Sequence, residues 1–393
     1  MKAMKWKFYS LAFVAGMSIL TAYSCDDNND NDGNGGNGNG NEIENGTILK
    51  GTITSDVTLA AGNTYKLSGE YIVEEGATLH IEEGVKIIAV YDDIADYILV
   101  KQGGKINAVG TSDKPIVMTS EKEEPGAWGG IHICGRAHTN AEGGKGSSEI
   151  GGAVYGGNDD ADNSGTLQYI RLEYTGFAFD EEHEANGISF YGVGNGTIVD
   201  HCQAYKGSDD GFEFFGGSVN VSNLVAVSCS DDSFDWTEGW NGKGTNLVAY
   251  QEAESTLGYD CDCLMECDNN GSNNAATPVA HPVLKNLILV GNGGSKQGIR
   301  LRAGTEVEID NAKVCGKGQP LTVETALTEN ALKNSTSKLT NITLTAELSS
   351  KEGIYTHADF IAVTSNKVDA NLSYSSFEDI RKECSWMNGS WVK

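Results

Sequence analysis

A short motif recurs along this chain at a spacing too small for a separate domain. Residues 208–214 read SDDGFEF, and residues 230–236, which begin 22 residues later, read SDDSFDW. Residues 186–190, 263–267 and 297–301 carry weaker versions of the same alternation of apolar and polar side chains. A short period with loop-sized additions is typical of a solenoid, in which each repeat buries its apolar side against the next one.

A column of asparagines accompanies this motif. Asparagine begins a β-prone run at five positions, namely Asn223, Asn246, Asn286, Asn311 and Asn341. Asparagine tolerates the left-handed backbone of a tight turn, and stacked side-chain amides can hydrogen-bond from one repeat to the next. Together the two columns predict an all-β fold, a right-handed parallel β-helix with three-strand coils of about 22 residues. A β-propeller fits less well, because each of its blades needs about 40–50 residues.

Strand alternation assigns the side chains of the motif to two faces. Phe212, Phe214 and Phe234 should point into the core, because successive side chains of a strand point to opposite faces. The polar residues between such core positions then form one outward column, which consists of Glu213, Asp235, Glu266 and Arg300.

The N-terminal sequence predicts a targeting signal and a flexible tether, neither of which belongs to the packed domain. Residues 1–24 combine a basic start with a short apolar run, which is typical of a secretory signal peptide. The small residues before Cys25 resemble a bacterial lipobox, which predicts cleavage there and lipidation of that cysteine. The alternative is an ordinary cleaved signal that leaves Cys25 as a free thiol. Residues 25–45 form an acidic, Gly- and Asn-rich tether. We therefore expect a protein held in the outer membrane by a lipid anchor.

The β-helix domain is expected over residues 46–393. Two stretches interrupt the repeat and are expected to be loop insertions, at 135–164 and 252–281. The first coils and a C-terminal region ending in Trp386 and Trp391 should cap the open ends, which otherwise invite strand addition.

The overall charge excludes one class of partner. The 393 residues include 55 Asp and Glu against 28 Lys and Arg, a net charge of −27. Nucleic-acid binding needs a basic surface for the phosphates, so nucleic acid is not an expected partner.

Several segments carry a resemblance to a known family. They are residues 76–84, 103–111, 127–131, 165–174, 209–213, 231–240 and 298–302. Over residues 46–393 the chain resembles the secreted and lipid-anchored right-handed β-helix proteins of the Bacteroidetes, within the pectate-lyase-like superfamily. The acidic run after Cys25 also resembles their signal for export to the cell surface. The resemblance implies a fold and a cell-surface location, but it does not imply an activity. The cysteines at 261–267 depart from the family's pattern.

The repeated acids predict a cation site. Equivalent outward residues in adjacent coils lie about 4.8 Å apart, so the repeats would stack like charges. Solvent, raised carboxyl pKa values or a bound cation can relieve this repulsion, and clustered carboxylate oxygens suit Ca²⁺. The candidate Ca²⁺ ligands are Asp209, Asp210, Asp231 and Asp232. The alternative is that these acids are solvated or cap turns.

Three outward residues are candidates for catalysis: Arg300, Glu213 and Asp235. Carboxylates, Ca²⁺ and an outward basic side chain are the ingredients of β-elimination by a polysaccharide lyase. Closely spaced carboxylates could instead serve a glycosidase. The alternative is that Arg300 forms salt bridges with the acidic column.

Because no catalytic set is complete, the preferred hypothesis is non-catalytic binding of an extracellular ligand, above all a glycan. The candidate ligand-binding residues are Glu213, Asp235, Trp240, Glu266 and Arg300. A Ca²⁺-dependent polysaccharide lyase and a structural or adhesive surface protein are the alternatives.

The cysteines predict a disulfide. Cys261, Cys263 and Cys267 lie close together, and their spacing lacks the paired C-x₂-C of a zinc site. An exported protein meets no reducing cytosol, so we expect a disulfide within this group or to Cys229.

Overall fold

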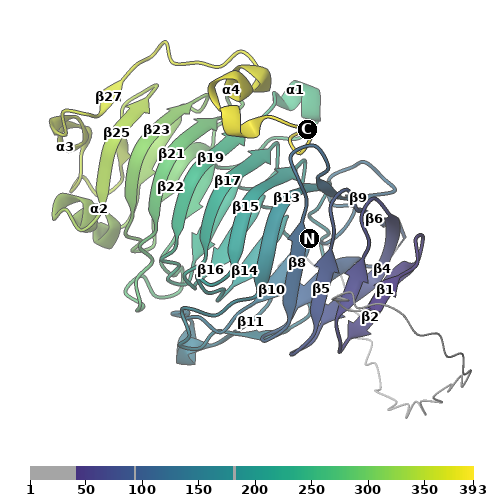
Figure 1. Ribbon diagram of the computed structural model, residues 1–393. Coiled ribbons are helices and arrows are strands. Elements are labelled where there is room, and N and C mark those ends of the chain that lie inside the picture. Colours follow the sequence, from purple (N-terminus) through teal and green to yellow (C-terminus); the bar gives the residue numbers. More distant parts are fainter. Residues whose placement is uncertain (1–40, 93, 180–182) are drawn as a thin grey trace, which may run out of the picture. The chain divides into compact units, whose positions relative to one another are not determined.

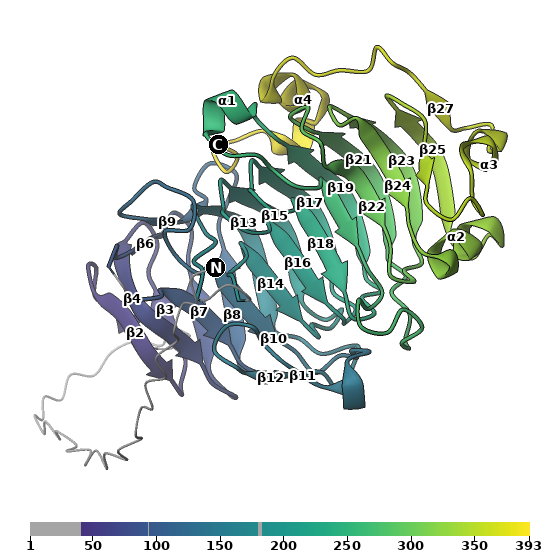
Figure 2. The ribbon, with the colours of Figure 1, turned by 180° about the vertical axis from the view of Figure 1, so that it is seen from behind.

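The structure is a computed structural model, and it describes residues 41–92, 94–179 and 183–393. Here the chain forms one long sheet of parallel strands wound into a right-handed β-helix (Figures 1 and 2). The predicted fold class is confirmed. The predicted signal peptide, Cys25 and the tether up to residue 40 lie outside the described residues. No helix among the described residues is long and apolar enough to cross a membrane.

Each coil passes over three faces of the β-helix, and long strands bend from the first face to the second. These bent strands are β13 (Gly165–Glu173), β15 (Ile198–Tyr205), β17 (Asn220–Val227), β19 (Lys243–Tyr250), β21 (Val283–Val290), β23 (Glu308–Cys315) and β25 (Lys338–Leu344). Shorter strands continue the first face, namely β1 (Asn41–Ile43), β3 (Val57–Leu59), β5 (Thr78–Ile81) and β8 (Lys105–Val109). The second face is continued by β6 (Lys86–Ala89), β9 (Ile116–Ser120) and β27 (Lys367–Val368).

The third face is built from shorter strands. They are β7 (Tyr97–Val100), β10 (Ile131–Cys134), β14 (Ile188–Tyr191), β16 (Phe212–Phe215), β18 (Phe234–Thr237), β20 (Met265–Cys267), β22 (Gln297–Leu301), β24 (Gln319–Val323) and β26 (Ser349–Ser350). Near the N-terminal end, β2 (Ile48–Ile53) and β4 (Thr64–Val73) bend from the second face to the third. Phe212 pairs with Phe234 across β16 and β18, which confirms the 22-residue coil.

The asparagine column forms the corner between the first and second faces. Its five asparagines have φ angles between 56° and 63°, the left-handed conformation that asparagine tolerates. The Asn246 amide donates to Asn223 at 2.8 Å, the Asn286 amide to Asn246 at 3.0 Å, and the Asn311 amide to Asn286 at 2.9 Å. The predicted side-chain ladder is therefore confirmed from Asn223 to Asn311, whereas the Asn341 amide donates to Asp310 at 2.7 Å.

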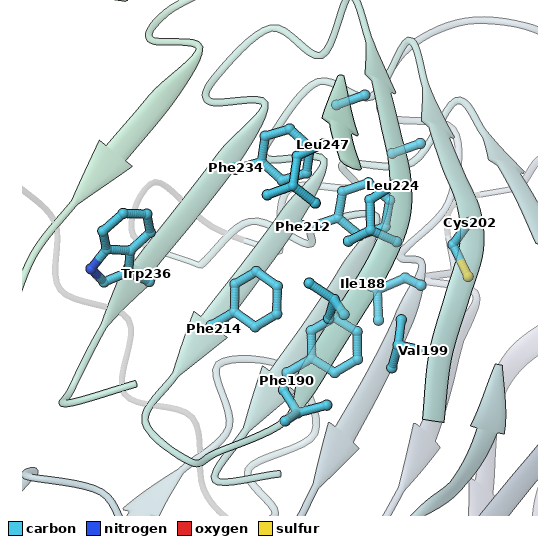
Figure 3. Packing of buried hydrophobic residues seen from close by; sticks show 14 of the residues in the cluster. Ile188, Phe190, Val199, Cys202, Phe212, Phe214, Leu224, Phe234, Trp236 and Leu247 are labelled. Carbon is cyan, nitrogen blue, oxygen red and sulfur yellow. The ribbon is translucent and has the colours of Figure 1, made fainter. Parts of the chain in front are cut away.

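Stacked aromatic rings fill the core behind the third face (Figure 3). Phe190 stacks on Phe214 with ring centroids 5.0 Å apart, and Phe212 stacks on Phe234 at 5.6 Å. Each of these rings is buried, as the alternation predicts. The residues between them therefore point outward, and the outward column stands on a rigid floor.

The two ends of the β-helix differ from the prediction. Residues 41–43, which were expected in the tether, form β1 and pair with β3. At the C-terminal end, α2 (Ala326–Lys333) and α3 (His357–Ala362) lie beside the last coils, and Phe360 of α3 belongs to the main core.

The C-terminal tail does not cap an end. It contains α4 (Phe377–Glu383) and the 3₁₀ turn η2 (Ser385–Met387), and it packs on the second face over the middle coils. Trp391 is buried there, with its ring 6.0 Å from Tyr169 and 5.2 Å from His201. The outward apolar side chains of this face, including Val225 and Val248, are buried by the tail, whereas α2 and α3 already lie beside the end coils.

The predicted insertions lie beside the third face. The 135–164 stretch contains the 3₁₀ turn η1 (Glu142–Gly144) and a hairpin of β11 (Gly146–Ser147) and β12 (Val154–Tyr155). The 252–281 stretch contains α1 (Glu254–Leu257), but it also contains β20, so part of it is a regular coil. Its length comes from the loops on either side of that strand.

Candidate functional site

An acidic cleft of about 490 Å³ opens on the outward side of the third face. The predicted polar site residues all line it, and they are Asp209, Asp210, Glu213, Asp231, Asp232, Asp235, Glu266 and Arg300. Apolar residues of the 135–164 insertion, including Ile150 and Tyr155, cover the same outward side closer to the N-terminus. The cleft begins where that cover ends.

The floor of the cleft is the predicted outward column. Glu213 pairs in register with Asp235, Asp235 with Glu266, and Glu266 with Arg300. Because parallel strands repeat at about 4.8 Å, three carboxylates and one guanidinium lie in a row.

The turns before these strands supply one wall. Asp232 donates its backbone N–H to Asp210 Oδ1 at 2.8 Å, and Cys263 donates its N–H to Asp232 Oδ1 at 2.6 Å. These bonds hold the Asp210 and Asp232 carboxylates in fixed positions, and both side chains still line the cleft. The turn-capping role considered for these acids is thus present together with their exposure to the cleft.

Among the described residues, Lys and Arg side chains form ion pairs with the cleft only at its C-terminal end. Arg300 pairs with Glu266 at 2.7 Å and with Glu324 at 3.4 Å, which confirms the salt-bridging role considered for it. Arg302 pairs with Glu266 as well, and Lys296 pairs with Asp262. No Lys or Arg in the described part of the chain forms an ion pair with the acids at 209–213 or 231–235.

Burial makes it energetically unfavourable to keep the cleft carboxylates ionised. Burial and neighbouring carboxylates raise the pKa of both Asp210 and Asp232 well above the ordinary value, and each residue is only 5% exposed. The same causes raise the pKa of Glu213 and Asp235 well above normal. Burial and the Asp231 carboxylate raise the pKa of Asp209 to about 7. Holding all these groups ionised needs a compensating positive charge.

Two buried oxygen atoms at the cleft have no hydrogen-bond partner among the described residues. They are Asp235 Oδ1 and Asn186 Oδ1. Asn186 is 1% exposed, and its amide donates to Ser189 at 3.0 Å and to Glu213. Buried oxygens without a donor are uncommon in proteins, and a bound ion is one explanation for them.

Comparison with known proteins identifies the family. The family model for a pectate-lyase-like β-helix domain matches residues 51–392. The chain belongs to this family. No curated protein and no solved structure matches the sequence. The family assignment supports the β-helix superfamily that the sequence motifs indicated.

The prediction for one site residue of this pectate-lyase-like β-helix protein is wrong. Trp240, expected to contact a ligand, is 1% exposed and stacks on Phe214 with ring centroids 4.1 Å apart. Its indole N–H donates to the Val219 carbonyl at 3.2 Å. The turn after β18 folds this ring into the core, where it has far more apolar contact than in an acidic cleft.

The predicted disulfide is not formed. Cys229, Cys261, Cys263 and Cys267 are all free and buried. Cys267 faces the main core at the end of β20, whereas Cys263 lies in the preceding turn, where its backbone bonds to Asp232. The coil therefore directs these side chains to different surroundings.

Sequence reasoning missed four lining residues. Asn186 and Asp262 occupy the same turn positions as Asp210 and Asp231, so a full alignment of the repeats could have found them. Glu149 and Glu184 come from loops outside the repeat, and no periodic signal points to them.

The cleft fits a hard divalent cation. Its donors are carboxylate oxygens and one amide oxygen, the ligands that Ca²⁺ prefers. Asp210, Glu213 and Asp235 each offer an oxygen within 4.8 Å of the others. The unpartnered oxygens of Asp235 and Asn186 are further potential ligands. Ca²⁺ bound there would neutralise the buried carboxylates and present open coordination positions to a ligand.

Proposed function

We propose that this protein is a lipid-anchored, cell-surface protein of the outer membrane whose β-helix binds an extracellular glycan through Ca²⁺, without catalysis. The observation that carries the proposal is the pair of coils at 209–213 and 231–235, whose carboxylates, with Asp210 and Asp232 buried, form no ion pair with a Lys or Arg of the described residues. The family assignment favours a carbohydrate-related role for this cleft. The lipid anchor at Cys25 rests on the sequence alone.

The chemistry of the cleft favours acidic sugars. Ca²⁺ takes about six to eight oxygen ligands, so three or four protein oxygens leave positions for a uronate carboxylate and a hydroxyl group. Without the cation, the acidic walls would repel a uronate. Trp240 is buried, and none of the described residues that line the cleft is aromatic, so a neutral sugar finds no ring there on which to stack. Binding should therefore depend on both the cation and the sugar's charge.

The test is binding to immobilised glycans with Ca²⁺ or with EDTA. Uronate-bearing glycans should be retained in Ca²⁺ and released by EDTA, and the Glu213→Gln/Asp235→Asn double variant should bind none of them. Glu308→Gln is the matched control, because Glu308 lies on the first face and pairs with Lys338 at 2.7 Å. Absence of binding to every glycan, or equal binding in EDTA, would contradict the proposal.

A polysaccharide lyase is the alternative enzyme, and Arg300 is poorly suited to serve as its base. Although burial acts in the opposite direction, the carboxylates of Glu324 and Glu266 raise the pKa of Arg300 above its already high ordinary value. A guanidinium held in this way does not accept a proton at physiological pH. Release of unsaturated, ultraviolet-absorbing products from a uronate polymer would establish the lyase instead.

A further inference from the structure

Three sets of cleft carboxylates among the described residues have oxygens within 4.8 Å of one another. One of them, Asp209, Asp210 and Asp231, lies in the turns, and the other two include residues of the floor and overlap. Asp210, Glu213 and Asp235 form the first set, in which the oxygens lie within 4.8 Å of one another. Asp232, Asp235 and Glu266 form the second set by the same criterion. The second set is the first one displaced by a single coil, since Asp235 pairs with Glu213 and Glu266 with Asp235. Asp235 belongs to both.

We infer that the cleft holds two divalent cations, one coil apart and bridged by the Asp235 carboxylate. The inference rests on the proposed function, because it describes how the cation-dependent cleft is loaded. One coil step of a parallel sheet is about 4.8 Å, a separation that a bridging carboxylate can span. Each ion would be held by one turn carboxylate and by two carboxylates of the floor.

The unpartnered oxygens support this arrangement independently of the charge. Asp235 Oδ1 is buried at the junction of the two sets and accepts no hydrogen bond from a described residue. Asn186 occupies the turn position one coil before Asp210, and its Oδ1 lacks a donor as well. Because its amide donates to Glu213, the Asn186 side chain is held beside the first set. A bound cation would provide a partner for Asp235 Oδ1 and for Asn186 Oδ1.

The row of ions should end after the second position. One coil further along, the chain supplies its own cations, Arg300 against Glu266 and Lys296 against Asp262. Arg302 also holds Glu266, so this carboxylate is shared between the arginines and the second ion. The first position should therefore bind more tightly than the second.

Counting bound ions tests the inference. The EDTA-stripped, full-length protein is dialysed against radioactive Ca²⁺, and bound ions per chain are measured as the Ca²⁺ concentration rises. The wild type should bind two ions in two steps. Glu213→Gln and Asp232→Asn should each bind one, because each replaces the charged carboxylate of one position only by a neutral, weaker amide ligand, and Asp235→Asn should weaken both steps at least tenfold. Glu308→Gln should still bind two.

The outcomes separate this inference from the proposed function. One ion in the wild type, lost in Glu213→Gln and retained in Asp232→Asn, would overturn the tandem site and leave cation-dependent glycan binding intact. No bound ion would overturn both. Arg302→Gln provides a second reading that does not remove a ligand: freeing Glu266 should tighten the second step and leave the first unchanged. Circular dichroism shows whether each variant keeps its β-helix.

Discussion

Two columns of polar side chains run along the same β-helix, and only one of them satisfies its own hydrogen bonds. In the asparagine column Asn246 and Asn286 each donate to the asparagine one coil back and accept from the asparagine one coil ahead. In the acidic column Glu213 and Asp235 stand in the same kind of register, but ionised carboxylates only accept hydrogen bonds. Equal stacking therefore stabilises one column and destabilises the other.

The comparison separates a structural ladder from a binding site. Asparagine can repeat indefinitely, because it is both donor and acceptor. A carboxylate column needs protons or cations from elsewhere, and among the described residues ion pairs to the column occur only at Glu266, through Arg300 and Arg302. The unneutralised positions, at Glu213 and Asp235, are thus the ones available to a ligand.

The largest effect is expected from breaking the ladder. Asn246→Val removes two side-chain hydrogen bonds and places a β-branched residue at a φ of 60°. The free energy of unfolding should fall by about 3 kcal/mol, from lost hydrogen bonds and backbone strain. Urea unfolding measures the change. Asn246→Gly keeps the backbone conformation and should lose only about 1 kcal/mol. Equal losses in the two variants would mean that the turn conformation contributes nothing.

The second effect is stabilisation of the acidic column by Ca²⁺. At a Ca²⁺ concentration about 100 times the dissociation constant, the free energy of unfolding should rise by about 2.7 kcal/mol for one site. Asp235→Asn should abolish this gain in thermal unfolding, since the shared ligand is lost. In EDTA, however, the variant should be more stable than the wild type, because a like charge is gone from the column. A wild type that melts identically with and without Ca²⁺ would contradict the assignment.

The third effect is a pH dependence that is specific to the cation-free protein. The pKa of Asp209 is raised to about 7, and burial and neighbouring carboxylates raise those of Asp210 and Asp232 well above normal, so the folded state binds more protons than the unfolded state between about pH 4 and pH 7. Stability then falls as the pH rises through this window, by about 1 kcal/mol after allowing for solvent screening. With Ca²⁺ present the trend should reverse, because protons compete with the ion. Melting curves at several pH values, in EDTA and in Ca²⁺, measure both trends.

The sequence predicts the order of residues in the acidic column but only part of their ion pairing. The register of Glu213, Asp235 and Glu266 follows from the repeat, because strand pairing preserves position from coil to coil. The ion pair between Arg300 and Glu324 does not follow from the repeat, because Glu324 comes from the next coil and belongs to no repeated motif.

The misassigned and missed residues lie outside the strands. Trp240 follows a turn whose path depends on packing against Phe214, and aromatic content alone does not tell a core ring from a ligand platform. Glu149 and Glu184 reach the cleft from irregular loops. Periodicity therefore predicts the floor of this site and the wall formed by the repeat turns, and tertiary packing decides which loop residues complete the cleft.

The smallest effect is expected from placing an acid in the asparagine ladder. Asn286→Asp keeps the bond accepted from Asn311 but cannot donate to Asn246 when it is ionised. Residue 286 is exposed, so water replaces part of the lost bond, and the cost should be about 0.5–1 kcal/mol at pH 7. Asn220→Asp is the matched control: Asn220 is also exposed, and its oxygen accepts the Lys243 backbone N–H at 2.9 Å, a bond that aspartate preserves.

The difference in stability between Asn286→Asp and the wild type should also depend on pH. Below about pH 4 the introduced carboxyl is protonated and can donate again, so the Asn286→Asp variant should approach the wild type in thermal unfolding. Asn220→Asp should follow the wild type at every pH. If Asn286→Asp costs no more than Asn220→Asp at pH 7, donation along the ladder does not contribute to stability. The contrast between the two columns would then rest on charge alone, and it would no longer depend on which groups can donate.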